Sequence, residues 1–260
     1  MKNIGRALVF LSGLIIFGCT NSYTVSNLKD PHDSTQIYND YVIKRPFGTV
    51  KIVGVNKQIL KMIERDFYSA PLAAQFSVSE IRIYHDPEDP EFRKKSVLAH
   101  FHANSQRMYL KFDGYKPYLV MPQGIICINC VYPNGTLRHE MSHAQVFFFG
   151  ISLVEIAEIS KWKYIGQFWD REDEKQYPKN GFLYAYSRSN ACEETARIVG
   201  AISNFYFGLQ DPFNSAATNV FYCIDKKDER YLKKIEVIHA FGLTTKAEYQ
   251  KILEFFNKPR

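Results

Sequence analysis

Residues 136–149 carry the feature that most restricts the fold of this chain. His139 and His143 stand four positions apart in an apolar segment, and Glu140 directly follows the first histidine. On a helix, residues four apart project from the same face, so both imidazoles can reach one metal ion. Burying these three polar side chains without partners would be unfavourable. The H-E-x-x-H spacing therefore predicts a buried helix that holds a metal ion.

Zinc is the metal expected at this spacing. Two histidines and a third protein ligand leave one tetrahedral position of a catalytic zinc open for water. Glu140 lies about 100° further round the helix, where its carboxylate can accept a proton from that water without binding the metal. A third histidine at the metzincin spacing is excluded, because position 149 is Phe149. The third ligand is therefore expected to be a carboxylate further along the chain.

The segment 181–197 resembles the second motif of gluzincin metallopeptidases related to anthrax lethal factor. It contains a tyrosine, a short polar turn with Asn190, and then the pattern E-x-x-A at the start of a helix. The resemblance implies that Glu193 is the third zinc ligand and that Tyr186 donates a hydrogen bond to the oxyanion. Ala196 is then the small residue that lets this helix approach the H-E-x-x-H helix. A carboxylate is also favourable at a helix N-terminus.

Some roles within this resemblance stay open. Three other carboxylates compete with Glu193 for the role of ligand: Glu194, Glu155 and Glu158. Tyr184 lies close enough in sequence to compete with Tyr186. The chain departs from the family at Arg197, where many relatives carry an acid that orients a zinc-bound histidine. Another group must then hold that histidine in place.

The N-terminus predicts an exported lipoprotein. Two basic residues precede an apolar run over 7–17, which is too short to span a bilayer and has the form of a secretory signal. A glycine and Cys19 follow, and they resemble a lipobox in which Cys19 is lipidated once 1–18 are removed. An ordinary signal peptide or a signal anchor is the alternative. Thr20 replaces the aspartate that retains lipoproteins at the inner membrane of enteric bacteria, so we expect the outer membrane, facing the periplasm.

Four further cysteines fit an oxidising compartment: Cys127, Cys130, Cys192 and Cys223. The sequence alone leaves their connectivity open. The pairs Cys127–Cys130 and Cys192–Cys223 are favoured, because the first two are close in sequence and Cys223 can return over a helix and a loop. The second disulfide would then fix the turn that carries Glu193.

The order of the expected elements predicts an α+β fold. Strands are expected at 49–55, 76–84, 96–103, 108–112 and 118–121, with a helix at 56–68. The strands at 96–103 and 108–112 are expected to form a hairpin. Helices follow at 136–149, 152–165, 190–207, 228–241 and 245–256. These elements predict a small mixed or antiparallel sheet followed by a helical zincin half that carries the H-E-x-x-H helix.

The expected organisation is a signal peptide over 1–18, a lipid anchor and tether over 19–45 and one metallopeptidase domain over 46–260. Hydrophobic residues make up 46% of the chain, which is enough for a substantial core. The net charge of +6 falls to +4 when two basic residues leave with the signal peptide. We see no basic stripe interleaved with aromatic residues, so nucleic acid is not an expected partner.

Together these patterns predict a zinc-dependent endopeptidase anchored to the bacterial envelope through its N-terminal lipid. Its expected partners are the membrane and a peptide or protein substrate, which would lie along the edge of the sheet as an added strand. The alternative is a non-catalytic interaction lipoprotein of the envelope that uses zinc for stability.

Overall fold

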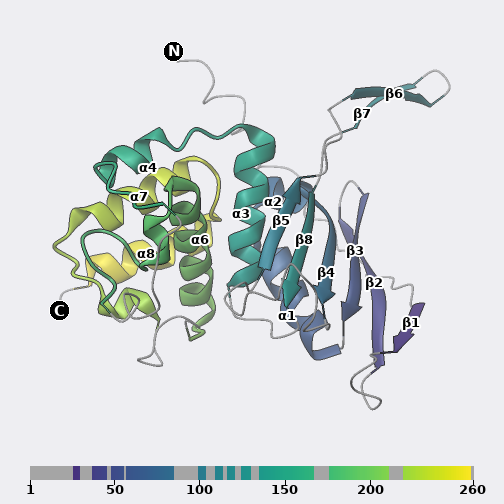
Figure 1. The fold of residues 1–260 in the computed structure, drawn as a ribbon, viewed down its shortest axis with the longest axis horizontal. Helices are drawn as coiled ribbons and strands as arrows, with labels where there is room; N and C mark the ends of the chain where they lie inside the picture. The colour runs from purple at the N-terminus through teal and green to yellow at the C-terminus, as the bar shows by residue number, and fades with distance from the viewer. Residues whose placement is uncertain are drawn as a thin grey trace.

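The computed structural model has an α+β architecture in which helix α3 lies between a β-sheet and a group of helices (Figure 1). It describes residues 26–29, 37–45, 48–55, 57–84, 99–103, 109–113, 116–120, 124–129, 135–166, 176–210 and 219–258. The strands are β1 (Ser26–Lys29), β2 (Ile37–Arg45), β3 (Gly48–Val55), β4 (Val78–Tyr84), β5 (Ala99–Ala103), β6 (Tyr109–Asp113), β7 (Lys116–Val120) and β8 (Gly124–Asn129). The helices are α1 (Lys57–Ser69), α2 (Leu72–Phe76), α3 (Thr136–Phe149), α4 (Val154–Ile159), α6 (Ala191–Phe207), α7 (Glu229–Ala240) and α8 (Lys246–Asn257), with short 3-10 helices η2 (Tyr186–Arg188) and η3 (Val220–Cys223). The predicted α+β class is confirmed.

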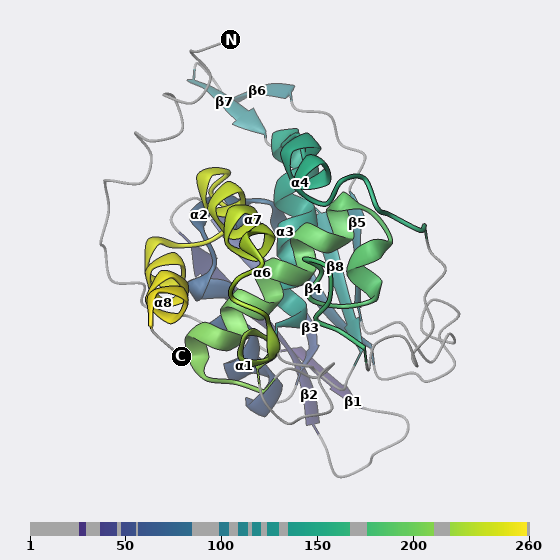
Figure 2. The same cartoon turned by 90° about the vertical axis from the view of Figure 1, so that its left-hand side faces the viewer.

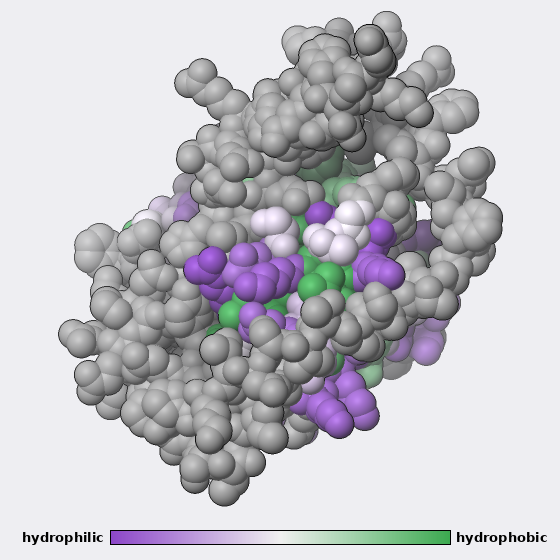
Figure 3. All heavy atoms as spheres, turned by 90° about the vertical axis from the view of Figure 1, so that its right-hand side faces the viewer, coloured by the Kyte–Doolittle hydropathy of each residue, from purple (hydrophilic) through white to green (hydrophobic). Residues whose placement is uncertain are grey.

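The main sheet is mixed and contains six described strands in the order β1-β2-β3-β4-β8-β5. The pairs β3–β4 and β4–β8 are parallel, whereas β1–β2, β2–β3 and β5–β8 are antiparallel. β5 ends this order, so one of its edges is not paired with another described strand. β6 and β7 form a separate two-stranded sheet. Seen from the sheet side of the molecule, the described residues show hydrophilic side chains with hydrophobic areas between them (Figure 3).

A first hydrophobic core joins the sheet to α1 and to one side of α3. The apolar residues of α1 recur at helical spacing and face this core, and Ile63 and Phe67 are fully buried. The same core contains Ile52 and Ile81 of the sheet and Met141 of α3. The H-E-x-x-H helix is therefore packed against the sheet along its apolar face.

A second core is formed by residues of the helices that lie on the other side of α3 from the sheet, and Figure 2 shows these helices from that side. Its central helix is α6, which contacts α3, α4, α7 and α8. Val199 and Ile202 of α6 are fully buried together with Ile235 and Ile238 of α7. This half of the molecule therefore holds α6 firmly against α3.

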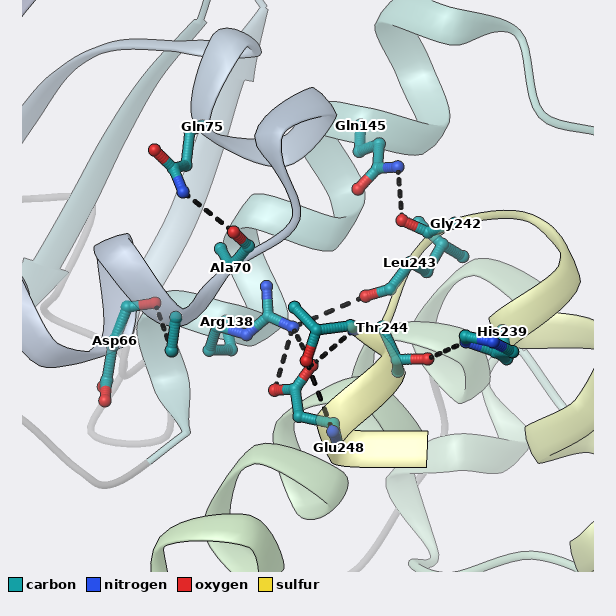
Figure 4. A network of polar contacts seen from close by, with 12 residues as sticks. Asp66, Ala70, Gln75, Arg138, Gln145, His239, Gly242, Leu243, Thr244 and Glu248 are labelled. Atoms are coloured by element: carbon teal, nitrogen blue, oxygen red, sulfur yellow. Dashed lines mark hydrogen bonds and ion pairs between the residues drawn. The ribbon is translucent and has the colours of Figure 1, made fainter. Parts of the chain in front are cut away.

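A buried polar network joins α3 to the C-terminal helices (Figure 4). Nη2 of Arg138 donates to both carboxylate oxygens of Glu248 at 3.2 Å, and both side chains are about 1% exposed. Glu248 also closes the capping box that starts α8, with Thr245. Nearer the end of α3, Gln145 donates to the carbonyl oxygen of Gly242 at 3.0 Å. The H-E-x-x-H helix is thus hydrogen-bonded to α8 and to the turn that precedes it.

The predicted strand pairing is wrong in one part. The hairpin expected between 96–103 and 108–112 does not form, because β5 pairs with β8 and β6 pairs with β7. β8 is not predicted by the sequence pattern, and it lies between β4 and β5 in the sheet. A strand inserted in this way takes partners that are distant in sequence, which local alternation of residue types does not reveal.

Two predicted boundaries also change. The tether expected over 19–45 is wrong in its C-terminal part, because β1 and β2 belong to the sheet and Tyr41 and Ile43 are buried in the first core. The helix expected over 152–165 is shorter, since α4 ends at Ile159 and Lys161 has a φ of 53°. A non-glycine residue with positive φ cannot continue an α-helix.

Several predicted features lie outside the described residues: the signal peptide over 1–18, Cys19 with its lipid and the second cysteine of the C-x-x-C pair, Cys130. Within the part of the chain that the structure does describe, no helix combines the length and apolar character needed to cross a bilayer.

Candidate metal centre

Helix α3 presents both histidines of the motif one turn apart. It begins after Gly135, whose φ of 76° lies in the left-handed region that glycine adopts without strain. The backbone amide of His139 donates to the carbonyl oxygen of Gly135 at 3.0 Å. The His139 and His143 rings follow on one side of the helix, with centroids 4.7 Å apart.

The first turn of α6 brings a carboxylate to these rings. The Asn190 side chain caps the helix and accepts a hydrogen bond from the Glu193 amide at 2.9 Å. This cap fixes the backbone of the turn. Oε2 of Glu193 lies 3.3 Å from Nε2 of His139 and 3.5 Å from Nε2 of His143. The structure thus brings together the three residues expected as ligands, and the carboxylate among them is Glu193, not Glu194.

The three candidate ligand atoms lie 3.0–3.5 Å apart, which is close to the spacing of ligand atoms around a tetrahedral zinc ion. The two histidine Nε2 atoms are 3.0 Å apart, and their distances to the carboxylate oxygen are 3.3 and 3.5 Å. Atoms bound about 2.0–2.1 Å from a tetrahedral zinc ion stand about 3.3–3.4 Å from one another. This group could hold a metal ion. Glu155 and Glu158, the distant alternatives as ligands, both lie on α4 and are not part of it.

The hydrogen bonding at this cluster also fits a metal ion. Oε2 of Glu193 is buried and has no hydrogen-bond partner within the described segments. Buried polar atoms are seldom left without a partner in folded proteins. Two imidazole nitrogens and a carboxylate oxygen that converge on one position are a common donor set for zinc. The residues present therefore fit the metal that the sequence predicts.

Close packing between α3 and α6 makes this convergence possible. A Cβ atom at Gly200 would lie 3.0 Å from the carbonyl oxygen of Gly135 and 3.7 Å from Cβ of His139. Ala196, one turn earlier on α6, is fully buried. Larger side chains at these positions would push the helices apart and move Glu193 away from the histidines. Sequence reasoning gave this role to Ala196 and missed Gly200, whose only local signal is a glycine within a helix.

Glu140 lies beside the ligand cluster without being part of it. Its Oε1 is 3.9 Å from Nε2 of His139, and the residue is 5% exposed. Burial raises the pKa of Glu140 to about 7, although the charges of His143 and Arg197 oppose this change and the charge of Glu193 adds to it. A carboxyl group with such a pKa can both accept and return a proton near neutral pH.

The two histidines have different electrostatic environments. Burial lowers the pKa of His139 to about 4, although the nearby Glu193 carboxylate opposes this change, so this ring is neutral at pH 7. Burial also lowers the pKa of His143, but the contact with Cys192 and the nearby carboxylates of Glu193 and Glu140 raise it well above its usual value. Metal ligands must be unprotonated, so metal binding here would release the proton of His143.

Tyr186 reaches the same cluster from η2. Burial and the negative charge of Glu193 together raise the pKa of Tyr186 to about 12, although the charge of Arg197 opposes this change. The phenol is therefore protonated at neutral pH and can donate a hydrogen bond. The Arg197 guanidinium lies 4.8 Å from the centre of the Tyr186 ring and 5.7 Å from that of Tyr184. Arg197 thus places a positive charge beside Tyr186.

Glu194 belongs to a separate buried cluster. It is fully buried and accepts hydrogen bonds from Ser160 Oγ at 2.8 Å and Tyr164 Oη at 2.6 Å. It also forms an ion pair with the buried Lys234, whose Nζ donates to the carbonyl oxygen of Gly181 at 2.8 Å. These contacts join α6 to α4 and α7, which is a structural role.

One predicted disulfide is wrong. Cys192 is a free thiol, so it is not bonded to Cys223. Its Sγ lies 3.1 Å from Nδ1 of His143 instead. The spacing argument let Cys223 return to Cys192 over a helix and a loop, whereas Cys192 lies in the first turn of α6 and contacts His143 of α3. The expected Cys127–Cys130 disulfide lies outside the described residues, because Cys130 is not among them.

Comparisons with known proteins identify no relative of this chain. No model of a known protein family matches the chain, and neither does any curated protein or solved structure. The candidate site therefore has to be judged on its own geometry and chemistry.

Proposed function

We propose that this chain is a zinc-dependent peptidase of the gluzincin type, with the H-E-x-x-H helix in a helical zincin half. The observation that carries the proposal is the convergence of His139, His143 and Glu193 at tetrahedral spacing, with Glu140 and Tyr186 beside them. Across the described segments, this group supplies three protein ligands and no fourth. In zinc enzymes the fourth position belongs to water or substrate, whereas structural zinc sites fill it with protein.

The side chains around the cluster match the steps of peptide hydrolysis. Bound zinc would supply Lewis acidity to the site. Glu140 accepts a proton as the water oxygen attacks the carbonyl carbon, and it gives that proton to the leaving amine as the C–N bond breaks. Tyr186 donates a hydrogen bond to the carbonyl oxygen while negative charge develops there.

An extended peptide can bind along β5. This strand ends the sheet and packs against α3, the helix that carries both histidines. A peptide strand added to the edge that no described strand occupies would form backbone hydrogen bonds with β5 and run beside α3. We therefore infer that the substrate is a peptide or an extended segment of a protein.

We also infer that the enzyme is anchored to the bacterial envelope, at the outer membrane and facing the periplasm. This inference rests on the N-terminal sequence, in which a signal-like apolar run precedes Cys19. A lipid on Cys19 would hold the protein at the membrane without a spanning helix. Cys19→Ser should remove the lipid label and release the protein from the membrane fraction, and unchanged labelling would contradict the lipobox.

Glu140→Gln tests catalysis without removing a metal ligand. Loss of the proton acceptor should lower the cleavage rate on a mixture of fluorogenic peptides by about 10²–10⁴-fold, while zinc stays at about one ion per chain. Glu155→Gln, an exposed change on α4, is the matched control and should cleave at the wild-type rate. Equal rates for Glu140→Gln and the wild type would contradict the role of Glu140.

Arg197 favours a second candidate function. Its guanidinium stacks on Tyr186 at the position where many gluzincins carry an acid. A non-catalytic interaction lipoprotein of the envelope, stabilised by zinc, would tolerate that change. Zinc binding through His139 and His143 without cleavage of any peptide in the mixture would favour this function over the peptidase.

A further inference from the structure

Cys192 contacts the metal cluster from outside it. It is the second residue of α6, directly before Glu193, and its Sγ lies 3.1 Å from Nδ1 of His143. The other ring nitrogen, Nε2, lies 3.0 Å from Nε2 of His139 and 3.5 Å from Oε2 of Glu193. One imidazole therefore has two different neighbours, with the candidate ligands at Nε2 and the thiol at Nδ1.

Metal binding at Nε2 of His143 would fix which atom is the donor in the contact between Nδ1 of His143 and Sγ of Cys192. A neutral imidazole carries one proton on its two nitrogens. With Nε2 bound to a metal, the proton of His143 is on Nδ1 and is donated to Sγ of Cys192. Histidine ligands generally donate their other N–H group to an acceptor, which fixes the tautomer and the ring orientation. The sulfur of Cys192 is at the position of that acceptor.

We propose that Cys192 is a positioning residue, which holds His143 in the tautomer and orientation that bind zinc through Nε2. This proposal rests on the zinc site proposed above. Arg197, five residues after Cys192 in α6, does not take this role. Arg197 stacks on Tyr186 instead, and the thiol acts from the first turn of the same helix.

The first turn of α6 would then carry both the ligand Glu193 and Cys192, the residue that positions the ligand His143. Asn190 caps this turn through the Glu193 amide, so the backbone positions of Cys192 and Glu193 are fixed together. A shift of this turn would move the third ligand and release His143 at the same time. Zinc affinity should therefore respond to the side chain at position 192, although that side chain does not bind the metal.

Competition with a chromophoric zinc chelator tests this role. Cys192→Ala removes the acceptor, and we expect the Kd for zinc to rise by about 10- to 100-fold. Cys192→Ser keeps an acceptor atom, although its Cβ–O bond is shorter than the Cβ–S bond of cysteine, and should recover part of the lost zinc affinity. Cys223→Ala removes an exposed cysteine in η3, outside the cluster, and should bind zinc as the wild type does.

Exchange of the Nδ1 proton of His143 with water distinguishes loss of this hydrogen bond from a general loss of packing. In the zinc-loaded wild type, NMR of 15N-labelled histidine should show His143 protonated at Nδ1, with this proton protected from exchange with water. The proton should exchange faster in Cys192→Ala and more slowly again in Cys192→Ser.

The outcomes separate this proposal from the proposed function. Wild-type protein that holds no zinc would overturn the zinc site and the role of Cys192 with it. Zinc bound by the wild type and by Cys192→Ala with the same Kd would overturn the role of Cys192 alone. A weaker Kd with an unchanged Nδ1–H signal would also overturn it, because altered packing would then be the cause.

Discussion

Two polar clusters each include a carboxylate from the first turn of α6, and these two carboxylates differ in their hydrogen-bond partners. Glu194 is fully buried and is paired with three side chains: Ser160, Tyr164 and Lys234. Glu193, one residue earlier, faces two imidazole nitrogens, and its Oε2 has no hydrogen-bond partner among the residues that the structure places. Adjacent carboxylates on one turn thus have opposite surroundings.

The difference shows what each cluster needs. The Glu194 cluster balances a negative with a positive charge and surrounds the carboxylate with donors, as a buried structural ion pair requires. The Glu193 cluster brings two imidazole nitrogens and a carboxylate oxygen to one position, so a cation would complete it. Variants at the first cluster should mainly change folding stability, and variants at the second should mainly change metal binding.

Lys234→Met should have the largest effect on stability. Lys234 is fully buried, pairs with Glu194 and donates to the carbonyl oxygen of Gly181. Methionine fills a similar volume but leaves the carboxylate without its counter-charge, and such a loss typically costs about 3–5 kcal/mol. Urea denaturation in the presence of a chelator measures the free energy of unfolding without a contribution from metal.

Lys233→Met is the matched control for this variant. The neighbouring lysine is exposed and pairs with Glu229 on the surface of α7. Its loss should leave the free energy of unfolding nearly unchanged, because exposed ion pairs contribute little. Equal losses in the two variants would show that the Glu194 cluster is no more important to stability than the surface of the helix.

Zinc should stabilise the wild type but not Glu193→Gln. A ligand that binds only the folded state adds about 2.7 kcal/mol to the free energy of unfolding when its free concentration is about 100 times its Kd. Glutamine keeps the size of the side chain and removes the negative charge at the cluster. Thermal unfolding with and without zinc should therefore show a shifted midpoint only in the wild type, and an equal shift in the variant would argue against Glu193 as a ligand.

Asn190→Ala should have the smallest effect, and it should act on both clusters. Loss of this N-cap typically costs about 1 kcal/mol, and fraying of the first turn of α6 should also weaken zinc binding. Asp228→Ala, which removes the N-cap of α7, is the control and should lower stability without changing the Kd for zinc. A Kd that is unchanged in Asn190→Ala would mean that the cap does not hold the ligand.

The longer helices and the two histidines of the candidate site could be predicted from sequence because their signals are local, whereas Glu193 was chosen through the resemblance of 181–197 to a known motif. The H-E-x-x-H spacing places two histidines on one side of a helix in any fold, and α3 has the predicted bounds, Thr136–Phe149. The capping pattern of Thr245 and Glu248 likewise marks the start of α8 correctly.

The features that sequence reasoning missed or left open depend on contacts between distant segments. β5 pairs with β8 rather than with the next strand. The choice between Glu193 and Glu194 depends on Lys234, which lies 40 residues further along the chain. The contact of Cys192 with His143 crosses from α6 to α3, and no local pattern distinguishes such a thiol from half of a disulfide.

Zinc K-edge X-ray absorption of the zinc-loaded wild type tests the central claim most directly, namely that His139, His143 and Glu193 hold zinc with one position open. We predict nitrogen and oxygen scatterers at about 2.0–2.1 Å, the outer-shell signature of imidazole and no sulfur at about 2.3 Å. A sulfur scatterer would contradict the claim, because Cys192 would then bind the metal itself. Protein that retains no zinc after dialysis would contradict it completely.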